Sequence, residues 1–250
     1  MEAISSAWAS LVERHPSHSI EFYGTLLVQL LFFWVPSAIY IALDALFPAF
    51  SSAHKLQPPP KQPTAAEVRH CLSVTLRNQL IVAAIAFVPY YYPHLLPSPI
   101  RVDPSLPSLT EFLAHFAACC AIREVLFYYS HRLFHVPALY RAVHKVHHRF
   151  TAPVALASQY AHPVEHIIAN MLPLAVPPAL VGAHVVTGWV FLAFMLAETA
   201  TVHSGFDFFG GLAAMHDEHH RRFNINFGGF GVLDWVHGTD GRVEKGKKGE

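Results

Sequence analysis

The sequence predicts an all-α integral membrane protein of about four to five transmembrane helices, joined to a helical domain rich in histidine. Hydrophobic residues make up 53% of the 250 residues and charged residues only 14%. The mean hydropathy is +0.32, and this balance is typical of membrane proteins. The chain also contains 19 histidines, and 13 of them lie from His131 onward.

Charge and cysteine content exclude two other classes of protein. Basic and acidic residues number 17 each, so no net field would attract nucleic acid. Of the three cysteines, Cys119 and Cys120 are adjacent inside an apolar run, which excludes a disulfide framework and a CxxC metal site. The cysteines are interpreted as packing residues in a reduced compartment.

The N-terminal tail, residues 1–21, lacks the basic segment that opens a cleavable signal. The apolar stretch that follows, 22–48, is too long for the hydrophobic core of such a signal. We therefore predict a retained first membrane anchor at 22–48. Pro36 leaves two topologies open there, a single crossing and a re-entrant hairpin.

The next elements alternate between polar and apolar segments. Residues 51–70 are polar and contain three consecutive prolines, which predicts a surface linker. A second span is expected at about 78–96, where tyrosines suit the lipid headgroup level. Ser108 or Thr110 can cap a third apolar segment that runs to about residue 130.

A long apolar stretch at 167–202 separates two histidine-rich regions. A helix crosses a bilayer in about 20 residues, and prolines and a glycine interrupt this stretch near its middle. We therefore predict two spans that form a membrane hairpin. Because two crossings return the chain to the side it left, the hairpin brings 131–166 and 203–220 together.

Basic residues predict the side of the membrane on which these regions lie. They flank the histidine clusters and occupy the first loop, whereas the opposite segments hold little more than Arg14 and Arg101. By the positive-inside rule, the clusters, the first loop and the C-terminus are expected to be cytosolic. The N-terminus is then luminal if 22–48 crosses once. The basic residues are Lys55, Lys61, Arg69, Arg77, Arg132, Arg141, Lys145, Arg149, Arg221, Arg222, Arg242, Lys245, Lys247 and Lys248.

Four histidine clusters carry the functional signal. They are HRLFH (His131, His135), HKVHH (His144, His147, His148), HPVEH (His162, His166) and HDEHH (His216, His219, His220). Residues three and four apart share one face of an α-helix, so each HxxxH and HxxHH is predicted to aim its imidazoles in one direction. The eight imidazoles of the first, second and fourth clusters exceed the four ligands of one zinc ion and fit two metal ions.

Other histidines receive separate predictions. His203 lies where the hairpin re-emerges and is predicted to be a further metal ligand. For His162 and His166, metal ligation and hydrogen bonding outside the ligand set both stay open, and Pro163 makes His162 a candidate helix N-cap. His184 is expected at the luminal turn of the hairpin, and His115 lies inside the third span, so both are predicted to lie away from the site.

Carboxylates commonly accept the second N–H of a ligating imidazole. Glu124, seven residues before His131, and Asp217, inside the last cluster, are predicted for this role. Glu198 is a further candidate because it is an ionisable group in an apolar run. The alternative interpretation of these residues is a charge that extends to the membrane interface. No catalytic residue beyond the metal centre is predicted.

The motifs resemble those of the fatty acid hydroxylase superfamily, most closely its sterol desaturase and C-4 methylsterol oxidase branch. The segments that carry the resemblance are FYYSHRLFH, HKVHHRFTAP, YAHPVEH, HSGFDF, HDEHH and GVLDWVHGTD. They cover roughly residues 120–240. Fatty acid hydroxylases place a second histidine four residues after His203, where this chain has Asp207; the difference favours sterols, and Asp207 joins the predicted outer carboxylates.

The resemblance implies a di-iron, O2-dependent monooxygenase in the endoplasmic reticulum membrane. Iron suits this chemistry because attack on an unactivated C–H bond needs a redox metal, although zinc can occupy such a site in purified protein. The electrons would come from NAD(P)H through cytochrome b5 and its reductase. The last four residues, KKGE, resemble a dilysine retrieval signal.

The expected organisation is an N-terminal tail (1–21), membrane spans with a proline-rich cytosolic linker (22–119), a hydroxylase-like domain (120–240) and a basic tail (241–250). The expected substrate is a sterol, with C-4 methylsterol oxidation favoured. Hydroxylation or desaturation of a sphingolipid, fatty acyl or ether lipid is the alternative within enzymes. A non-catalytic metal-binding membrane protein is the alternative outside them. No HExxH motif occurs, which disfavours a metalloprotease.

Overall fold

The computed structural model describes residues 2–57, 60–208 and 210–241. Over these residues the secondary structure is helical, apart from two isolated bridges that pair Lys55 with Phe206 and Arg101 with His184. The predicted all-α class is therefore confirmed. The α-helices are α1 (Glu2–Arg14), α2 (Ser17–Gln29), α3 (Val35–Leu46), α4 (Pro48–His54), α5 (Ala65–Tyr91), α6 (Leu109–Phe134), α7 (Pro137–Ala142), α8 (Pro163–Glu165), α9 (Leu172–Leu180), α10 (Val185–Val202), α11 (Leu212–Arg222) and α12 (Val232–His237).

Four short segments have other helical geometries. Two are π-helical, η1 (Leu30–Trp34) and η4 (His166–Met171), and two are 3-10 helices, η2 (His144–Arg149) and η3 (Ala155–Gln159). Four helical stretches are long and apolar enough to cross a membrane: Ser17–Leu46, Ala65–Tyr91, Leu109–Phe134 and Val185–Val202. The chain is thus a multi-pass membrane protein.

The first of these stretches is continuous, because η1 joins α2 to α3 without a turn. The π-helical segment ends at Trp34, two residues before Pro36, whose ring would otherwise clash with the carbonyl of the preceding turn. Local widening of the helix accommodates the proline. Of the two topologies that Pro36 left open, the structure has the single continuous helix and not a re-entrant hairpin.

The second stretch differs from its prediction at both ends, since the helix ends at Tyr91 and not near residue 96. Helix α5 begins at Ala65, because Thr64 and Glu67 form a capping box in which each side chain bonds the other's backbone N–H. The predicted linker 51–70 is correspondingly shorter. Its residues Lys55 and Gln57 are buried, with 8% of each exposed, so the interpretation of this segment as surface is wrong there. Pro58 and Pro59 lie outside the described residues.

A helical hairpin occupies this stretch, and its two arms differ. The descending arm, Pro163–Leu180, runs through α8, η4 and α9, and α10 forms the ascending arm. The descending arm is not among the four candidate spans; it contains Glu165, His166 and Asn170 as well as apolar residues. The turn lies beside Arg101, whose backbone bonds Ala183 and Val185.

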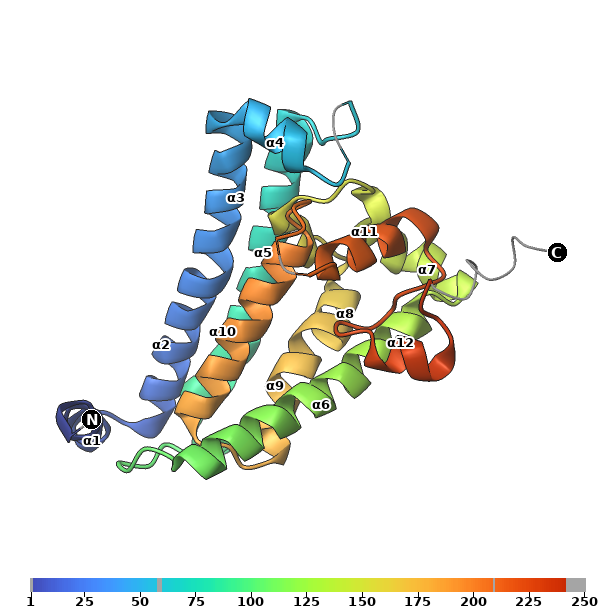
Figure 1. The fold of residues 1–250 in the computed structure, drawn as a ribbon. Helices are drawn as coiled ribbons and strands as arrows, with labels where there is room; N and C mark the ends of the chain where they lie inside the picture. Colours follow the sequence, from blue (N-terminus) through green and yellow to red (C-terminus); the bar gives the residue numbers. More distant parts are fainter. Residues whose placement is uncertain (1, 58–59, 209, 242–250) are drawn as a thin grey trace.

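The two ends of the helical bundle carry different features (Figure 1). At one end, α1 packs on the hairpin turn, where Trp8 donates to the Asp103 carbonyl at 2.8 Å and its ring contacts His184. At the other end, α7 and α11 lie across the ends of α6 and α10 (Figure 1). The histidine clusters gather at this second end, and His184 and His115 lie away from them, as predicted.

Candidate metal centre

Four segments supply the histidines of the site. The C-terminal end of α6 carries His131 and His135, and η2 carries three more. The residue that ends α10 is His203, and α11 carries the last three. The nine side chains are buried except His135, which is partly buried.

The nine imidazoles form two adjoining groups. Within each group, one ligand atom per residue lies within 4.8 Å of every other. The five-histidine group contains His131, His135, His144, His148 and His219, and the four-histidine group contains His147, His203, His216 and His220. The groups are neighbours, since the ring centroids of His148 and His220 are 4.8 Å apart. Each group offers at least as many imidazoles as a four-coordinate metal needs.

The prediction that each HxxHH aims its rings in one direction is wrong. In both motifs the first and fifth residues join one group and the fourth joins the other; His216 and His220 share a group, while His219 belongs to its neighbour. In the α-helix α11, which turns 100° per residue, positions i+3 and i+4 diverge by that angle although both lie near position i. HKVHH lies in the 3-10 helix η2, which turns about 120° per residue, so its fourth and fifth positions also diverge. Each motif therefore contributes to both groups.

Hydrogen bonds fix the direction of five rings. The Nδ1–H groups of His131 and His219 donate to the carbonyls of Phe227 and Ile225, both at 2.7 Å. In the four-histidine group, His203 donates to the Thr199 carbonyl at 2.8 Å and His147 to the Tyr160 carbonyl at 3.3 Å. The fifth ring, His144, donates to a carboxylate described below. With Nδ1 carrying the proton, Nε2 presents its lone pair to the centre of the group.

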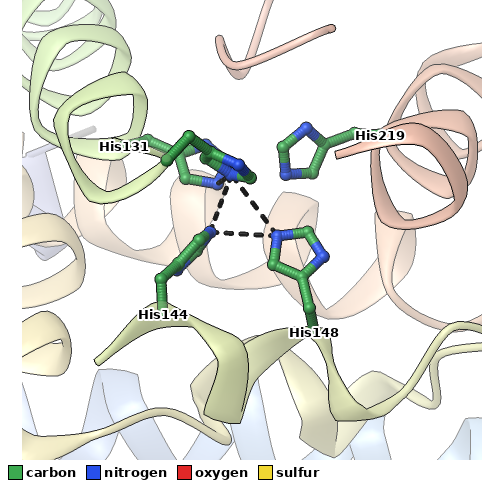
Figure 2. A group of neighbouring side chains, drawn as sticks. His131, His144, His148 and His219 are labelled. Atoms are coloured by element: carbon green, nitrogen blue, oxygen red, sulfur yellow. Dashed lines mark hydrogen bonds between the residues drawn. The ribbon is translucent and has the colours of Figure 1, made fainter. Parts of the chain in front are cut away.

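The donor set fits metal ions. In the five-histidine group, Nε2 of His144 lies 2.8 Å from Nε2 of His135 and 3.0 Å from that of His148. Ligands held 2.0–2.1 Å from one tetrahedral metal would be separated by roughly 3.3 Å. The Nε2 of His219 is buried and has no hydrogen-bond partner. Figure 2 shows the rings of His131, His144, His148 and His219 pointing toward a common centre, as a shared cation requires.

Burial keeps these rings neutral. Loss of hydration, and then the neighbouring histidines, lowers the pKa of His135 to about 2. Burial likewise lowers the pKa of His147 to about 4 and that of His203 to about 3. Neutral imidazole is the form that ligates a metal, so the lone pairs are free for a metal at neutral pH.

One carboxylate that contacts a ligand histidine was not predicted. Glu165 Oε1 accepts the Nδ1–H of His144 at 2.7 Å. Burial by itself raises the pKa of this carboxyl group, and a metal cation on His144 would favour its ionised form. Glu165 lies inside the HPVEH cluster, so its motif was visible in the sequence although its role was not. A carboxylate in this position orients the ring and increases its basicity as a ligand.

The carboxylates that were predicted for this role bond other groups. Asp217 accepts from Gln57 Nε2 at 2.7 Å, and the exposed Asp207 accepts from Gly211 N at 3.0 Å. Glu198 lies 3.7 Å from Arg123. The fourth, Glu124, accepts the backbone N–H groups of Gly229 and Phe230, both at 3.1 Å.

The loop that Glu124 holds also orients two ligand rings. Its carbonyls at Ile225 and Phe227 accept from His219 and His131, as described above. A second buried carboxylate, Asp234, accepts from Phe227 N, Gly228 N and Thr239 Oγ1 at 2.7–2.8 Å. Glu124 therefore acts on the five-histidine group through this loop. Asp234 was not predicted, although it lies in the GVLDWVHGTD segment.

His162 and His166 lie outside both groups. The His162 Nδ1 accepts from Val164 N at 3.2 Å and caps α8, as the following proline indicated. The ring of His166 is buried, and its Nδ1 lies 3.2 Å from the side-chain amide nitrogen of Asn170. The structure thus places the nine other predicted ligands together and these two apart.

Replacement of Glu165 tests the role of its carboxylate. Glu165→Gln keeps an oxygen that can accept from His144 but removes the charge, and loss of such a partner typically weakens metal binding 10- to 100-fold. We expect a loss of about this size for one of two bound metal ions, measured by metal titration of the full chain. Glu218→Gln is the matched control, because Glu218 pairs with Arg221 and Arg222 at the surface. Equal affinities in the two variants would contradict the role.

The fold and the site define a class: a multi-pass membrane protein with a histidine-rich candidate metal site at one end of its helices. The model of the family described as Fatty acid hydroxylase matches residues 116–239. Methylsterol monooxygenase 2-2 of Arabidopsis thaliana is 30% identical over 95% of this chain and 92% of its own length. The chain therefore belongs to the fatty acid hydroxylase family, as its motifs indicated.

Two further relatives are similar to this chain but are longer than it. Fatty acid hydroxylase domain-containing protein 2 of Macaca fascicularis is 39% identical over 88% of this chain and 66% of its own length. The sequence motifs also resemble the group of fatty acid hydroxylase domain-containing protein 2, and this match confirms the resemblance. Fatty acid hydroxylase ahd1 of Mycosarcoma maydis is 33% identical over 77% of this chain and 50% of its own length. The chain thus spans one half to two thirds of these two relatives. No solved structure matches it.

Proposed function

We propose that this chain is a membrane di-iron oxygenase that hydroxylates or oxidises a sterol-type lipid, with C-4 methylsterol oxidation as the favoured reaction. The observation that carries the proposal is the pair of adjoining groups of neutral, buried imidazoles, whose Nε2 atoms converge. Membership of the fatty acid hydroxylase family supports an oxidoreductase. The name of the Arabidopsis relative, a methylsterol monooxygenase, supports the substrate.

In this proposal the nine histidines hold two iron ions, and bound iron supplies redox chemistry with O2 that zinc does not. The protein's own groups keep the ligands in position: Glu165 holds His144, and the carbonyls of Phe227 and Thr199 hold His131 and His203. Aromatic rings pack beside the five-histidine group; Phe223 and Phe227 lie 4.9 and 5.0 Å from histidine rings. Such apolar walls exclude water from the site.

A small cavity lies among residues that contact the ligand histidines, and we propose that it takes the reacting end of a lipid. This cavity of about 40 Å³ is lined by residues that include Phe127, Leu196 and Thr199. No ligand histidine lines this cavity, but two of its lining residues contact one: the Phe127 ring lies 5.1 Å from that of His131, and the Thr199 carbonyl bonds His203. It has room for one small group, which suits a terminal group better than a lipid body.

The topology and the partners complete the proposal. The hydroxylase-like domain is taken as 120–240, and the site is placed on the cytosolic side of the endoplasmic reticulum membrane by the positive-inside rule. Cytochrome b5 and its reductase would deliver electrons from NAD(P)H. The predicted basic tail, 241–250, falls almost entirely outside the described residues.

A second candidate is a hydroxylase or desaturase that acts on another lipid. It is favoured by the similarity to fatty acid hydroxylase ahd1. The residue that favours sterols is Asp207, at a position where fatty acid hydroxylases have a histidine. The two candidates share the metal centre and differ in substrate.

The test is lipid profiling by mass spectrometry of cells that lack the chain, complemented with wild type or with His147→Ala plus His148→Ala. The double variant removes one ligand from each group. We expect 4-methylsterols to accumulate without the chain and to return to normal only with wild type. Unchanged sterols with altered sphingolipids, acyl lipids or ether lipids would support the second candidate. No change in any lipid would contradict both.

A further inference from the structure

A short segment from the N-terminal half of the chain passes between the segments that carry the metal ligands. It consists of Lys55, Leu56 and Gln57, and is called the strap below. Leu56 N donates to the Gly205 carbonyl at 2.9 Å, and Lys55 pairs with Phe206 as an isolated bridge. The strap is thus bonded to the residues that directly follow His203.

The side chain of Lys55 is a buried cation with three partners. It is 2% exposed, and its Nζ donates to the Ser204 carbonyl at 2.6 Å and to Asp44 Oδ2 at 2.9 Å. The same Nζ lies 4.3 Å from the centre of the Phe206 ring. A buried ammonium group needs such partners, because unpaired charge is costly to bury. Its position is therefore fixed, and so is that of the Ser204 carbonyl.

Gln57 joins two further ligand-bearing segments. Its Nε2 donates to the Thr151 carbonyl at 2.6 Å and to Asp217 Oδ1 at 2.7 Å. Thr151 follows η2, and Asp217 lies next to His216 in α11. One amide group thus connects the two HxxHH segments, which have no covalent link near this point.

These contacts fall mainly on one side of the centre. Lys55 holds the residue after His203, and Gln57 holds the residue after His216; both histidines belong to the four-histidine group. The hydrogen bonds of the strap do not reach α6, which carries His131 and His135 of the other group. We propose that Lys55 and Gln57 are positioning residues for the metal of the four-histidine group. The inference rests on the two-metal centre proposed above.

The test is a titration of Fe(II), without oxygen, into full-length protein stripped of metal by a chelator. Wild type is expected to bind two equivalents. Lys55→Met and Gln57→Met keep side-chain length but remove the donors. We expect them to weaken one equivalent about tenfold or more, the range for lost partners outside a ligand set, and to leave the other within about twofold.

Two reference variants assign the weakened ion. The Mössbauer signal lost in the strap variants should match the signal lost in His216→Ala and differ from that lost in His135→Ala. Arg69→Met controls for the loss of an exposed cation.

Three results would overturn the inference. Strap variants that bind two ions as wild type does would show that the contacts have no effect on the metal. Parallel loss of both ions, with a lower melting temperature of the metal-free protein, would show that the strap only supports the fold. If the lost signal matches the one lost in His135→Ala, the strap acts on the five-histidine group and not on the four-histidine group. Wild type that binds no iron would instead contradict the proposed function.

Discussion

Replacement of His144 and His148 by alanine is expected to reduce lipid oxidation at least about a hundredfold and to reduce bound metal from two ions to one per chain. Both Nε2 atoms face the centre of the five-histidine group, 3.0 Å apart, and the double variant leaves that group three imidazoles. Loss of a partner outside a ligand set typically lowers affinity or activity 10- to 100-fold. Loss of two ligands themselves should have an effect at least as large as the upper end of this range. Turnover of 4-methylsterol and metal analysis of the purified protein measure the two effects.

The control for this variant is His162→Ala. His162 lies outside both groups and caps α8. We therefore expect the His162→Ala variant to lose about 1 kcal/mol of stability and to bind as much metal as wild type. If His162→Ala lost metal as the double variant does, the assignment of nine ligands would be wrong.

Replacement of Asp234 by alanine is expected to lower the free energy of unfolding by about 3–5 kcal/mol, because it leaves two buried backbone N–H groups without an acceptor and removes a partner of the partly buried Thr239 hydroxyl. Asp234 is fully buried and accepts from Phe227 N, Gly228 N and Thr239 Oγ1. The Phe227 carbonyl orients His131, so the variant should also weaken metal binding. Denaturant titration in detergent micelles, with and without metal, measures both changes.

Asp207→Asn is the matched stability control. Asp207 is exposed and accepts one bond, from Gly211 N, which an amide oxygen can also accept. Its effect should stay within about 0.5 kcal/mol, as for most surface substitutions. An Asp234→Ala variant as stable as this control would show that the loop does not depend on the carboxylate.

Local patterns were sufficient for much of the fold. The length and composition of the apolar stretches predicted the spans, and the prolines near Gly182 predicted the hairpin that brings distant histidines together. The start of α5 was missed because the apolar pattern begins later than the Thr64 cap. The strap was missed because PPP dominates its neighbourhood, and burial of Lys55 depends on partners about 150 residues away.

The candidate site shows the same division between local and distant information. Spacing identified eight of the histidines that lie together, but HPVEH has the same HxxxH spacing as HRLFH and lies apart, and His203 belongs to no cluster. The assignment of each ring to one of two groups depends on how η2 faces α11 across the site, which spacing does not contain. Glu165, and not Glu124 or Asp217, bonds a ligand ring because the fold places it against His144, and sequence spacing does not show this contact. The predicted roles of Asp207 and Asp217 stay predictions.

The two longest ligand-bearing helices, α6 and α10, reach the site with their C-terminal ends, where His135 and His203 are the capping residues. The peptide dipoles of a helix sum to roughly half a negative charge at that end. Imidazole ligands contribute no formal charge, and among the described contacts only Glu165 brings a carboxylate to a ligand ring. The backbone of these two helices therefore supplies part of the negative potential that two cations need, each end contributing about 0.3–1 kcal/mol. This potential belongs to the fold and would persist in any variant that keeps α6 and α10 in place.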